Sequence, residues 1–235
     1  MRSGGSAGGG RWPKVVVFDL DGTLVDSAPD IARALASGFG PLGVPPFPLD
    51  AVKGMIGGGA AVAIRRAAAV ASFELTPDIE AGIYARFMET YAAASAEGRG
   101  LYPGAVELLS ELGAEGHGLG LVTNKAEPIT AIALKALGID RHFAAIIGAR
   151  DTRPKKPDPA GLLEALAILG ATPGEAVMIG DSAADIGAAK AAGCRSIAIS
   201  HGYSRVPPRE LGADLVVDHL SEVRAALRRI AGAVG

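Results

Sequence analysis

The sequence predicts an α/β protein in which a doubly wound, mostly parallel sheet carries a small helical domain inserted after its first strand. Two observations support this fold class. Short and almost continuous apolar runs alternate with helix-like segments, which is typical of strands covered on both faces. In addition, the long interval between the first two predicted strands contains helical patterns alone. The chain has 235 residues, enough for such a sheet and a small insertion.

The predicted elements follow one another in regular alternation. The apolar runs that predict strands are 14–18, 119–123, 144–148, 176–180, 196–200 and the weaker 213–217. The helix-like segments between or beside them are 103–115, 127–137, 159–169 and 182–192. Gly138 and Gly193 stand just after two of these segments, as glycines that end helices do. This alternation indicates parallel strands joined by helical crossovers.

The interval 28–98 interrupts the alternation. It contains the Ala-rich helical patterns 30–39, 60–71 and 77–97, and a glycine-rich run at 54–60. We therefore predict a separate helical domain at 28–98, and an α/β core built from 11–27 together with 99–235. The glycine-rich residues 1–10 are predicted to be a flexible tail.

The composition limits the classes of function. Lys and Arg number 23 and Asp and Glu number 25, so the net charge of −2 argues against nucleic acid as a partner. Cys194 is the single cysteine, which excludes an intrachain disulfide and favours a packing role in a reducing compartment. No apolar run reaches the roughly 18 residues that span a bilayer. These observations predict a soluble protein of the cytoplasm that binds no membrane.

Polar residues follow the predicted strands at the edge where ligands bind in open α/β sheets. They are Asp19, Asp21 and Thr23 after the first run, Thr123, Asn124 and Lys125 after the second, Lys156 after the third, and Asp181 and Asp185 after the fourth. Carboxylates without His or Cys suit Mg²⁺. Lysine, threonine and backbone N–H groups suit phosphoryl oxygens. One carboxylate could attack phosphorus while a second, two residues later, acts as acid and then base.

Four motifs in order carry a family resemblance. They are FDLDGTLVDS, LVTNK, KPDP and IGDSAADIGAAKAAG. With them, the chain resembles the haloacid dehalogenase-like superfamily from residue 14 to about residue 220. Within it the chain most closely resembles the phosphoglycolate phosphatases, on these motifs and on HGY at 201–203. The resemblance implies a Rossmann-like core, and it implies that the insertion at 28–98 is the family's helical cap.

The resemblance also implies roles for the motif residues. Asp19 would be the nucleophile that becomes phosphorylated, and Asp21 the general acid and base. Mg²⁺ would be held by Asp19, the backbone carbonyl of Asp21, and Asp181. Thr123, the backbone at Asn124, and Lys156 would hold the phosphoryl group. Asp185 would orient Lys156 or a metal-bound water, rather than being an exposed acid in the first turn of a helix.

Other positions are open to two interpretations. Lys156 is preferred over its neighbour Lys155 because it directly precedes Pro157. Lys125 could be functional or an ordinary exposed lysine at a helix start. In the insertion, Gly57 and Gly58 could approach the substrate or form a plain turn. Arg65 is a candidate for binding a substrate carboxylate, although an exposed helix face explains it equally well.

These features predict a magnesium-dependent phosphate-monoester hydrolase whose partner is a small phosphorylated metabolite, phosphoglycolate or a similar compound. Asp21 argues against a dehalogenase and a phosphonoacetaldehyde hydrolase, although Lys53 in the insertion keeps the latter open. A phosphomutase of the β-phosphoglucomutase type would keep both aspartates and is also open. A binding protein without turnover is the alternative from another class. The oligomeric state, monomer or homodimer, is not determined by the sequence.

Overall fold

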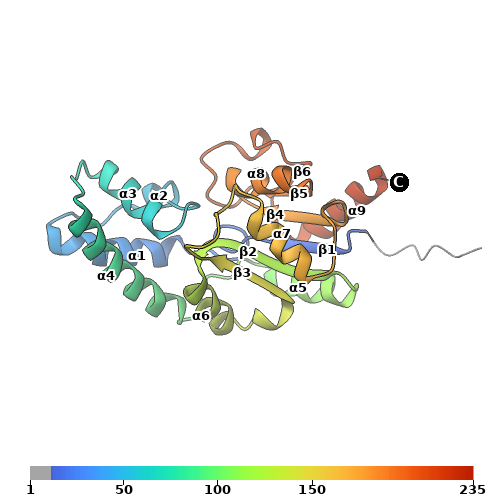
Figure 1. The fold of residues 1–235 in the computed structure, drawn as a ribbon, viewed down its shortest axis with the longest axis horizontal. Helices are drawn as coiled ribbons and strands as arrows, with labels where there is room; N and C mark the ends of the chain where they lie inside the picture. Colours follow the sequence, from blue (N-terminus) through green and yellow to red (C-terminus); the bar gives the residue numbers. More distant parts are fainter. Residues whose placement is uncertain (1–11, 235) are drawn as a thin grey trace, which may run out of the picture.

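The computed structural model describes residues 12–234, and the predicted tail at 1–10 lies outside them. These residues form a parallel sheet of six strands in the order β3-β2-β1-β4-β5-β6 (Figure 1). The strands are β1 (Val15–Phe18), β2 (Gly118–Ala126), β3 (Ala145–Ala149), β4 (Ala176–Gly180), β5 (Arg195–Ile199) and β6 (Leu215–Val217). The sheet confirms the predicted α/β class, and every predicted apolar run corresponds to one of its strands.

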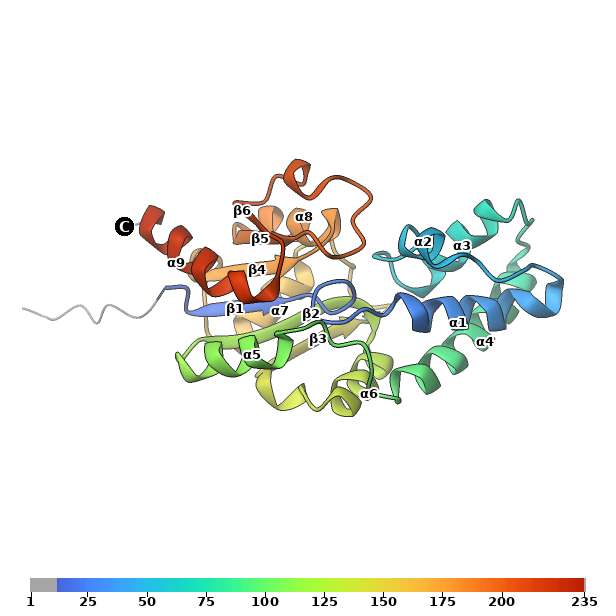
Figure 2. The same ribbon diagram turned by 180° about the vertical axis from the view of Figure 1, so that it is seen from behind.

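Helices cover both faces of the sheet, which explains why its strands are apolar throughout. On one face lie α5 (Ala105–Ala114), α6 (Glu127–Leu137) and α9 (Val223–Val234), and on the other α7 (Ala160–Ile168) and α8 (Ala183–Ala192) (Figure 2). Val16 and Phe18 of β1 pack into the first layer, and Val15 and Val17 pack into the second. Successive strand residues therefore bury opposite faces of the same strand.

The helical insertion is formed by α1 (Ala28–Phe39), α2 (Leu49–Lys53), α3 (Ala60–Val70) and α4 (Pro77–Ser95). Its apolar cluster, which Ile129 of α6 joins, is centred on fully buried residues such as Leu35, Phe39 and Ile83. Phe39 makes edge-to-face contacts with Phe47 and Phe73, at ring-centroid distances of 5.6 and 6.0 Å. The insertion lies beyond one end of the sheet, opposite the end that carries the C-terminus (Figures 1 and 2).

The two segments that connect the insertion to the sheet run side by side. Val25 and Leu101 form an antiparallel bridge. The backbone N–H of Asp26 donates to the carbonyl of Gly100 at 2.7 Å, and the N–H of Tyr102 donates to the carbonyl of Leu24 at 2.9 Å. The chain therefore leaves the core and returns to it at one place.

The sequence missed some elements. Helices α2 and α9 were not predicted, nor were the short 3₁₀ turns at Gly40–Leu42, Asp140–His142, Pro173–Glu175, Pro208–Glu210 and Leu220–Glu222. Strand β2 continues to Ala126, so Lys125 belongs to a strand and not to a helix start. Cys194 is buried in the layer beneath α7, as predicted for a packing cysteine. None of the helices in residues 12–234 has the length and apolar character needed to cross a membrane.

Candidate active site

The predicted site residues lie at the point where the strand order reverses, between β1 and β4. Asp19 follows β1 directly and Asp181 follows β4 directly. The turn after β1 requires Gly22, which has a φ of +88°. A Cβ atom there would also lie 2.5 Å from Oδ2 of Asp181. The glycine of the first motif therefore permits the close approach of the two strand ends.

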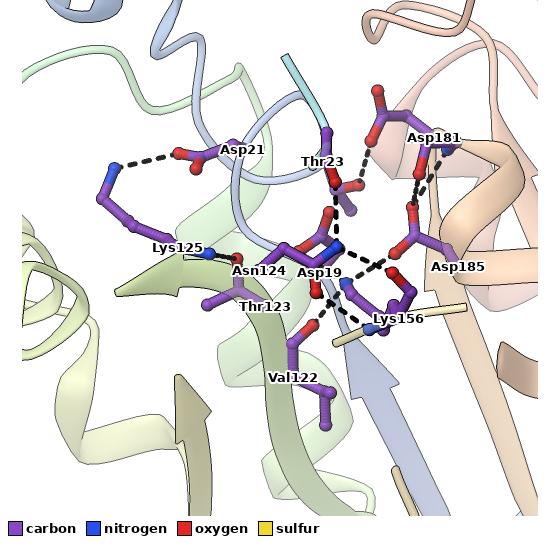
Figure 3. Close-up of polar contacts among 12 residues, drawn as sticks. Asp19, Asp21, Thr23, Val122, Thr123, Asn124, Lys125, Lys156, Asp181 and Asp185 are labelled. Carbon is purple, nitrogen blue, oxygen red and sulfur yellow. Dashed lines mark hydrogen bonds and ion pairs between the residues drawn. The ribbon is translucent and has the colours of Figure 1, made fainter. Parts of the chain in front are cut away.

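Lys156 joins two of the carboxylates. Its Nζ lies 2.9 Å from Oδ1 of Asp19 and 2.6 Å from Oδ1 of Asp185, and it also donates to the carbonyl of Val122 at 2.6 Å (Figure 3). The other carboxylate oxygen of Asp185 accepts hydrogen bonds from the backbone N–H and the hydroxyl of Ser182. Asp185 is fully buried, so the interpretation as an exposed first-turn acid is wrong. Its contacts orient Lys156 toward Asp19.

Asp181 is held by backbone and hydroxyl donors. The N–H of Tyr203 donates to Oδ2 at 2.6 Å, and the hydroxyl of Thr23 donates to Oδ1 at 3.3 Å. Asp181 is 2% exposed. The residues around Tyr203 thus support this carboxylate from a loop that the four motifs do not include.

The carboxylates fit a divalent cation. Asp19, Asp181 and Asp185 each offer an oxygen within 4.8 Å of the others, and Lys156 is the ammonium group that faces them. Burial, reinforced by Asp185, raises the pKa of Asp19 from 3.8 to about 7 despite the opposing effect of Lys156. Burial and the same neighbour raise the pKa of Asp181 well above its usual value. Oδ1 of Asp19 is buried and pairs with Nζ of Lys156. Such an excess of buried carboxylates, all oxygen donors, suits Mg²⁺.

Lys156 stays protonated in this cluster. Burial alone would lower its pKa, but the charges of Asp185 and Asp19 outweigh that effect and raise it. Lys155, the neighbour considered in the sequence, is exposed, whereas Lys156 is 7% exposed. The structure therefore brings the predicted lysine of the pair to the carboxylates.

Asp21 has a different set of partners. Its Oδ1 lies 3.0 Å from Nζ of Lys125, and the hydroxyl of Tyr91 lies 3.4 Å from its Oδ2. Lys125 and Tyr91 also contact each other through Nζ and the hydroxyl. The side chain of Lys125 is 3% exposed, so the interpretation as an exposed lysine is wrong. Tyr91 belongs to α4, and no motif in the sequence pointed to it.

Asn124 links the sheet to the insertion. Its side-chain amide donates to the carbonyl of Gly57 at 2.9 Å and to that of Lys156 at 3.0 Å, and its Oδ1 accepts from the N–H of Lys156. The neighbouring Thr123 is buried, and its hydroxyl accepts from the N–H of Lys125. Asn124 thus fixes the loop that carries Lys156 as well as the glycine-rich loop.

A small cavity of about 50 Å³ separates the sheet from the insertion. Its polar wall includes Asp19, Asp21, Thr123, Asn124, Lys125 and Asp181, and the insertion contributes Ile31, Ile56, Gly57, Gly59, Phe87 and Tyr91. Gly58 and Arg65 do not line it. Arg65 is instead exposed and pairs with Glu80 at 2.7 Å, so the structure gives no support to its predicted contact with a substrate. Lys53 is also outside the cavity, where it pairs with Asp50 on an exposed face.

The acidic strand ends face an enclosed cavity and offer a candidate site for a divalent cation, an arrangement suited to a hydrolase that acts through carboxylates. A sequence profile of the haloacid dehalogenase-like hydrolases matches residues 16–199. The chain belongs to this family, which confirms the resemblance and the predicted class of enzyme.

Individual relatives agree with this assignment. The chain is 41% identical over 218 residues to phosphoglycolate phosphatase 1 of Pseudomonas aeruginosa, covering 91% of this chain and 79% of the relative. It is 38% identical to the phosphoglycolate phosphatase of Caulobacter vibrioides, with 90% and 89% covered.

Solved structures resemble it as well. The crystal structure of a predicted phosphoglycolate phosphatase from Haemophilus somnus has a TM-score of 0.85 at 32% identity, covering 91% of this chain and 97% of the other. CbbY from Rhodobacter sphaeroides in complex with phosphate has a TM-score of 0.75 at 29% identity, covering 89% and 96%.

Proposed function

We propose that the protein is a magnesium-dependent phosphate-monoester hydrolase that acts on phosphoglycolate or a similarly small phosphorylated acid. The observation that carries this proposal is the division of the site around its first two carboxylates. Asp19 pairs with Lys156 and belongs to the carboxylate cluster that suits a metal ion. Asp21 instead faces Lys125 and Tyr91. Two carboxylates in such different surroundings are suited to two different roles.

Asp19 attacks the phosphorus atom of the substrate in the proposed reaction. Its carboxylate oxygen forms a bond to phosphorus, the ester oxygen leaves, and Asp21 gives that oxygen a proton. Asp21, now ionised, takes a proton from water, which attacks the aspartyl phosphate and releases inorganic phosphate. Lys156 offsets negative charge on Asp19 and on the transferred group throughout.

Asp19, Asp181 and the backbone carbonyl of Asp21 would hold the Mg²⁺ ion, which supplies positive charge opposite the phosphoryl oxygens when bound. Asp185 keeps Lys156 in place through its 2.6 Å contact. Thr123 and the backbone at Asn124 would donate to the phosphoryl group. Gly57 brings the insertion to the site through its hydrogen bond to Asn124.

The substrate is proposed from the relatives and from the lining of the cavity. The curated relatives named above are phosphoglycolate phosphatases. The largely apolar lining that the insertion contributes favours a small acid over a sugar phosphate with several hydroxyl groups, which disfavours the phosphomutase alternative. Lys53 pairs with Asp50 outside the cavity, so it is not placed to form the imine that a phosphonoacetaldehyde hydrolase would need. The cap role of residues 28–98, a cytoplasmic location, and a monomer or homodimer stay predictions.

Phosphate release by the purified protein tests the proposal. We expect hydrolysis of phosphoglycolate and of p-nitrophenyl phosphate with Mg²⁺, loss of both activities in EDTA, and recovery when Mg²⁺ is returned. Protein quenched in acid during turnover should carry an acyl phosphate that hydroxylamine removes. Turnover that persists in EDTA, or phosphorylation at a residue other than Asp19, would contradict it.

A further inference from the structure

The described lining of the cavity offers one cationic side chain that could pair with a second negative charge on a substrate. Its lining from the insertion and from α6 is apolar, with Ile31, Ile56, Phe87 and Ile129 among the residues exposed to the space. A carboxylate placed against such side chains loses its hydration and needs a cationic partner. Among the described residues that line the cavity, Lys125 is the single one with a cationic side chain.

Lys125 is arranged to bind a further anion. Its ammonium group has three N–H donors. In the described part of the chain two of them are accounted for by Oδ1 of Asp21, at 3.0 Å, and by the hydroxyl of Tyr91. The side chain is nearly fully buried and its ammonium lies 4.1 Å from the centre of the Tyr91 ring. These contacts fix the ammonium at the cavity wall with one donor to spare.

Lys125 also lies where the carboxylate of the substrate is expected in the proposed reaction. In the proposed reaction Asp21 protonates the ester oxygen, so the leaving group lies beside Asp21. In phosphoglycolate the carboxylate carbon is two bonds from that oxygen. The carboxylate therefore comes next to the partner of Asp21, which is Lys125.

From these three observations we propose that Lys125, positioned by Tyr91, selects phosphate monoesters of short hydroxy acids by pairing with their carboxylate. This inference rests on the proposed phosphatase function and deepens it, because it assigns the substrate class to one residue. It also replaces Arg65 as the carboxylate-binding group, since Arg65 pairs with Glu80 outside the cavity. Helix α4, which carries Tyr91, would thus hold in place the lysine that binds the substrate carboxylate.

The test compares phosphoglycolate with 2-hydroxyethyl phosphate, which has the same length and an alkoxide leaving group but no carboxylate. The wild-type protein should prefer phosphoglycolate in kcat/KM. Lys125→Met should lower that preference by roughly 10- to 100-fold, the usual effect of losing a hydrogen bond between charged groups. Lys125→Arg should retain most of the preference. The control Lys53→Met removes an exposed lysine outside the cavity and should leave the preference unchanged.

The outcomes separate this inference from the proposed function. An equal loss for both esters in Lys125→Met would overturn the inference and leave Lys125 with the single task of orienting Asp21. A wild-type protein that releases no phosphate from any ester would instead overturn the proposed function.

Melting curves show whether Lys125→Met is folded. If it is not, Lys125→Gln, which keeps polar donors but not the charge, decides the matter by the same ratio of kcat/KM values. Inhibition supplies a second readout, because glycolate should inhibit hydrolysis of p-nitrophenyl phosphate less strongly in the charge-free variant than in the wild type. Unchanged inhibition by glycolate would also count against the inference.

Discussion

The two walls of the cavity are built in different ways. The wall formed by the strand ends carries Asp19, Asp21, Asp181 and Lys125, whereas the wall formed by the insertion is mainly apolar, with residues such as Phe87. Charged groups on the first wall are held by ion pairs and backbone donors. The comparison supports our proposal that the sheet supplies the chemistry, while the insertion shapes the cavity and excludes water from it.

Tyr91 is the exception that joins the two walls. It comes from the insertion, yet its hydroxyl contacts Lys125 and approaches Asp21. Burial and the charge of Asp21 raise the pKa of Tyr91 well above its usual value, so its hydroxyl stays protonated and neutral. The insertion therefore contributes one polar group to an otherwise apolar wall.

The largest effect is expected on the charged wall. Asp19→Asn should reduce kcat by more than about 10³-fold, because the nucleophile is lost. Its melting temperature in EDTA at pH 8 should stay equal or rise, because burial makes the ionised form of Asp19 unfavourable. Phosphate-release assays and calorimetry measure both quantities. Asp151→Asn, at an exposed position, is the matched control and should change neither. A variant that loses activity and stability together would show that Asp19 is a structural residue.

A substitution in the apolar core of the insertion should lower stability, whereas Asp19→Asn is expected to lower activity and not stability. Phe39→Ala removes a fully buried ring that contacts Phe47 and Phe73, and should lower the free energy of unfolding by about 3–5 kcal/mol. Urea denaturation followed by circular dichroism measures this loss. Val70→Ala, at a side chain with 61% exposure, should cost far less. Equal losses in the two variants would contradict the separate core of the insertion.

Stabilisation by Mg²⁺ should depend on pH. The folded-state pKa of Asp19, about 7, exceeds its ordinary value of 3.8, so its contribution to stability is full below pH 3.8 and is lost as the pH rises to about 7. In the proposed site Mg²⁺ would bind the ionised carboxylate and offset this loss. The rise in melting temperature on adding Mg²⁺ should be larger at pH 8 than at pH 5.5, at matched ionic strength. The same rise at both pH values would mean that the ion binds elsewhere.

The smallest effect is expected at Arg65. Its pairing with Glu80 is exposed, and such surface pairs contribute little to stability. Arg65→Ala should therefore change kcat/KM for phosphoglycolate by less than about twofold. Steady-state kinetics with this ester provide the measurement. A large rise in KM would restore Arg65 as a substrate-binding residue and weaken the assignment to Lys125.

The sheet and its polar edge could be predicted because both depend on local patterns. Apolar runs mark strands buried on both faces, and the carboxyl ends of parallel strands meet at one edge, so Asp19 and Asp181 were expected to converge. Asp185 followed from the same motif. Its burial did not, because a first-turn acid is equally stable on an exposed helix.

The contacts across the cavity could not be predicted in this way. Tyr91 is separated from Asp21 by 70 residues, and their contact depends on how the insertion packs against the sheet. Lys125 looked like a residue at a helix start because the strand signal faded after Thr123, although β2 runs on to Ala126. Helix α9 was missed although its buried residues recur at the spacing of an amphipathic helix, so the sequence did contain a signal for it; these residues are Val223, Ala226, Leu227 and Ile230.

The two segments that connect the insertion to the sheet would allow the insertion to change independently of the sheet. Since the segments at Val25 and Leu101 bridge each other, the chain could replace everything between them with a short turn and leave the strands of the sheet in register. An insertion attached in this way could be lengthened or exchanged without a change in the strands of the sheet. Changes between the two bridged segments would therefore alter the apolar wall of the cavity and leave Lys125 and the carboxylates of the sheet in place.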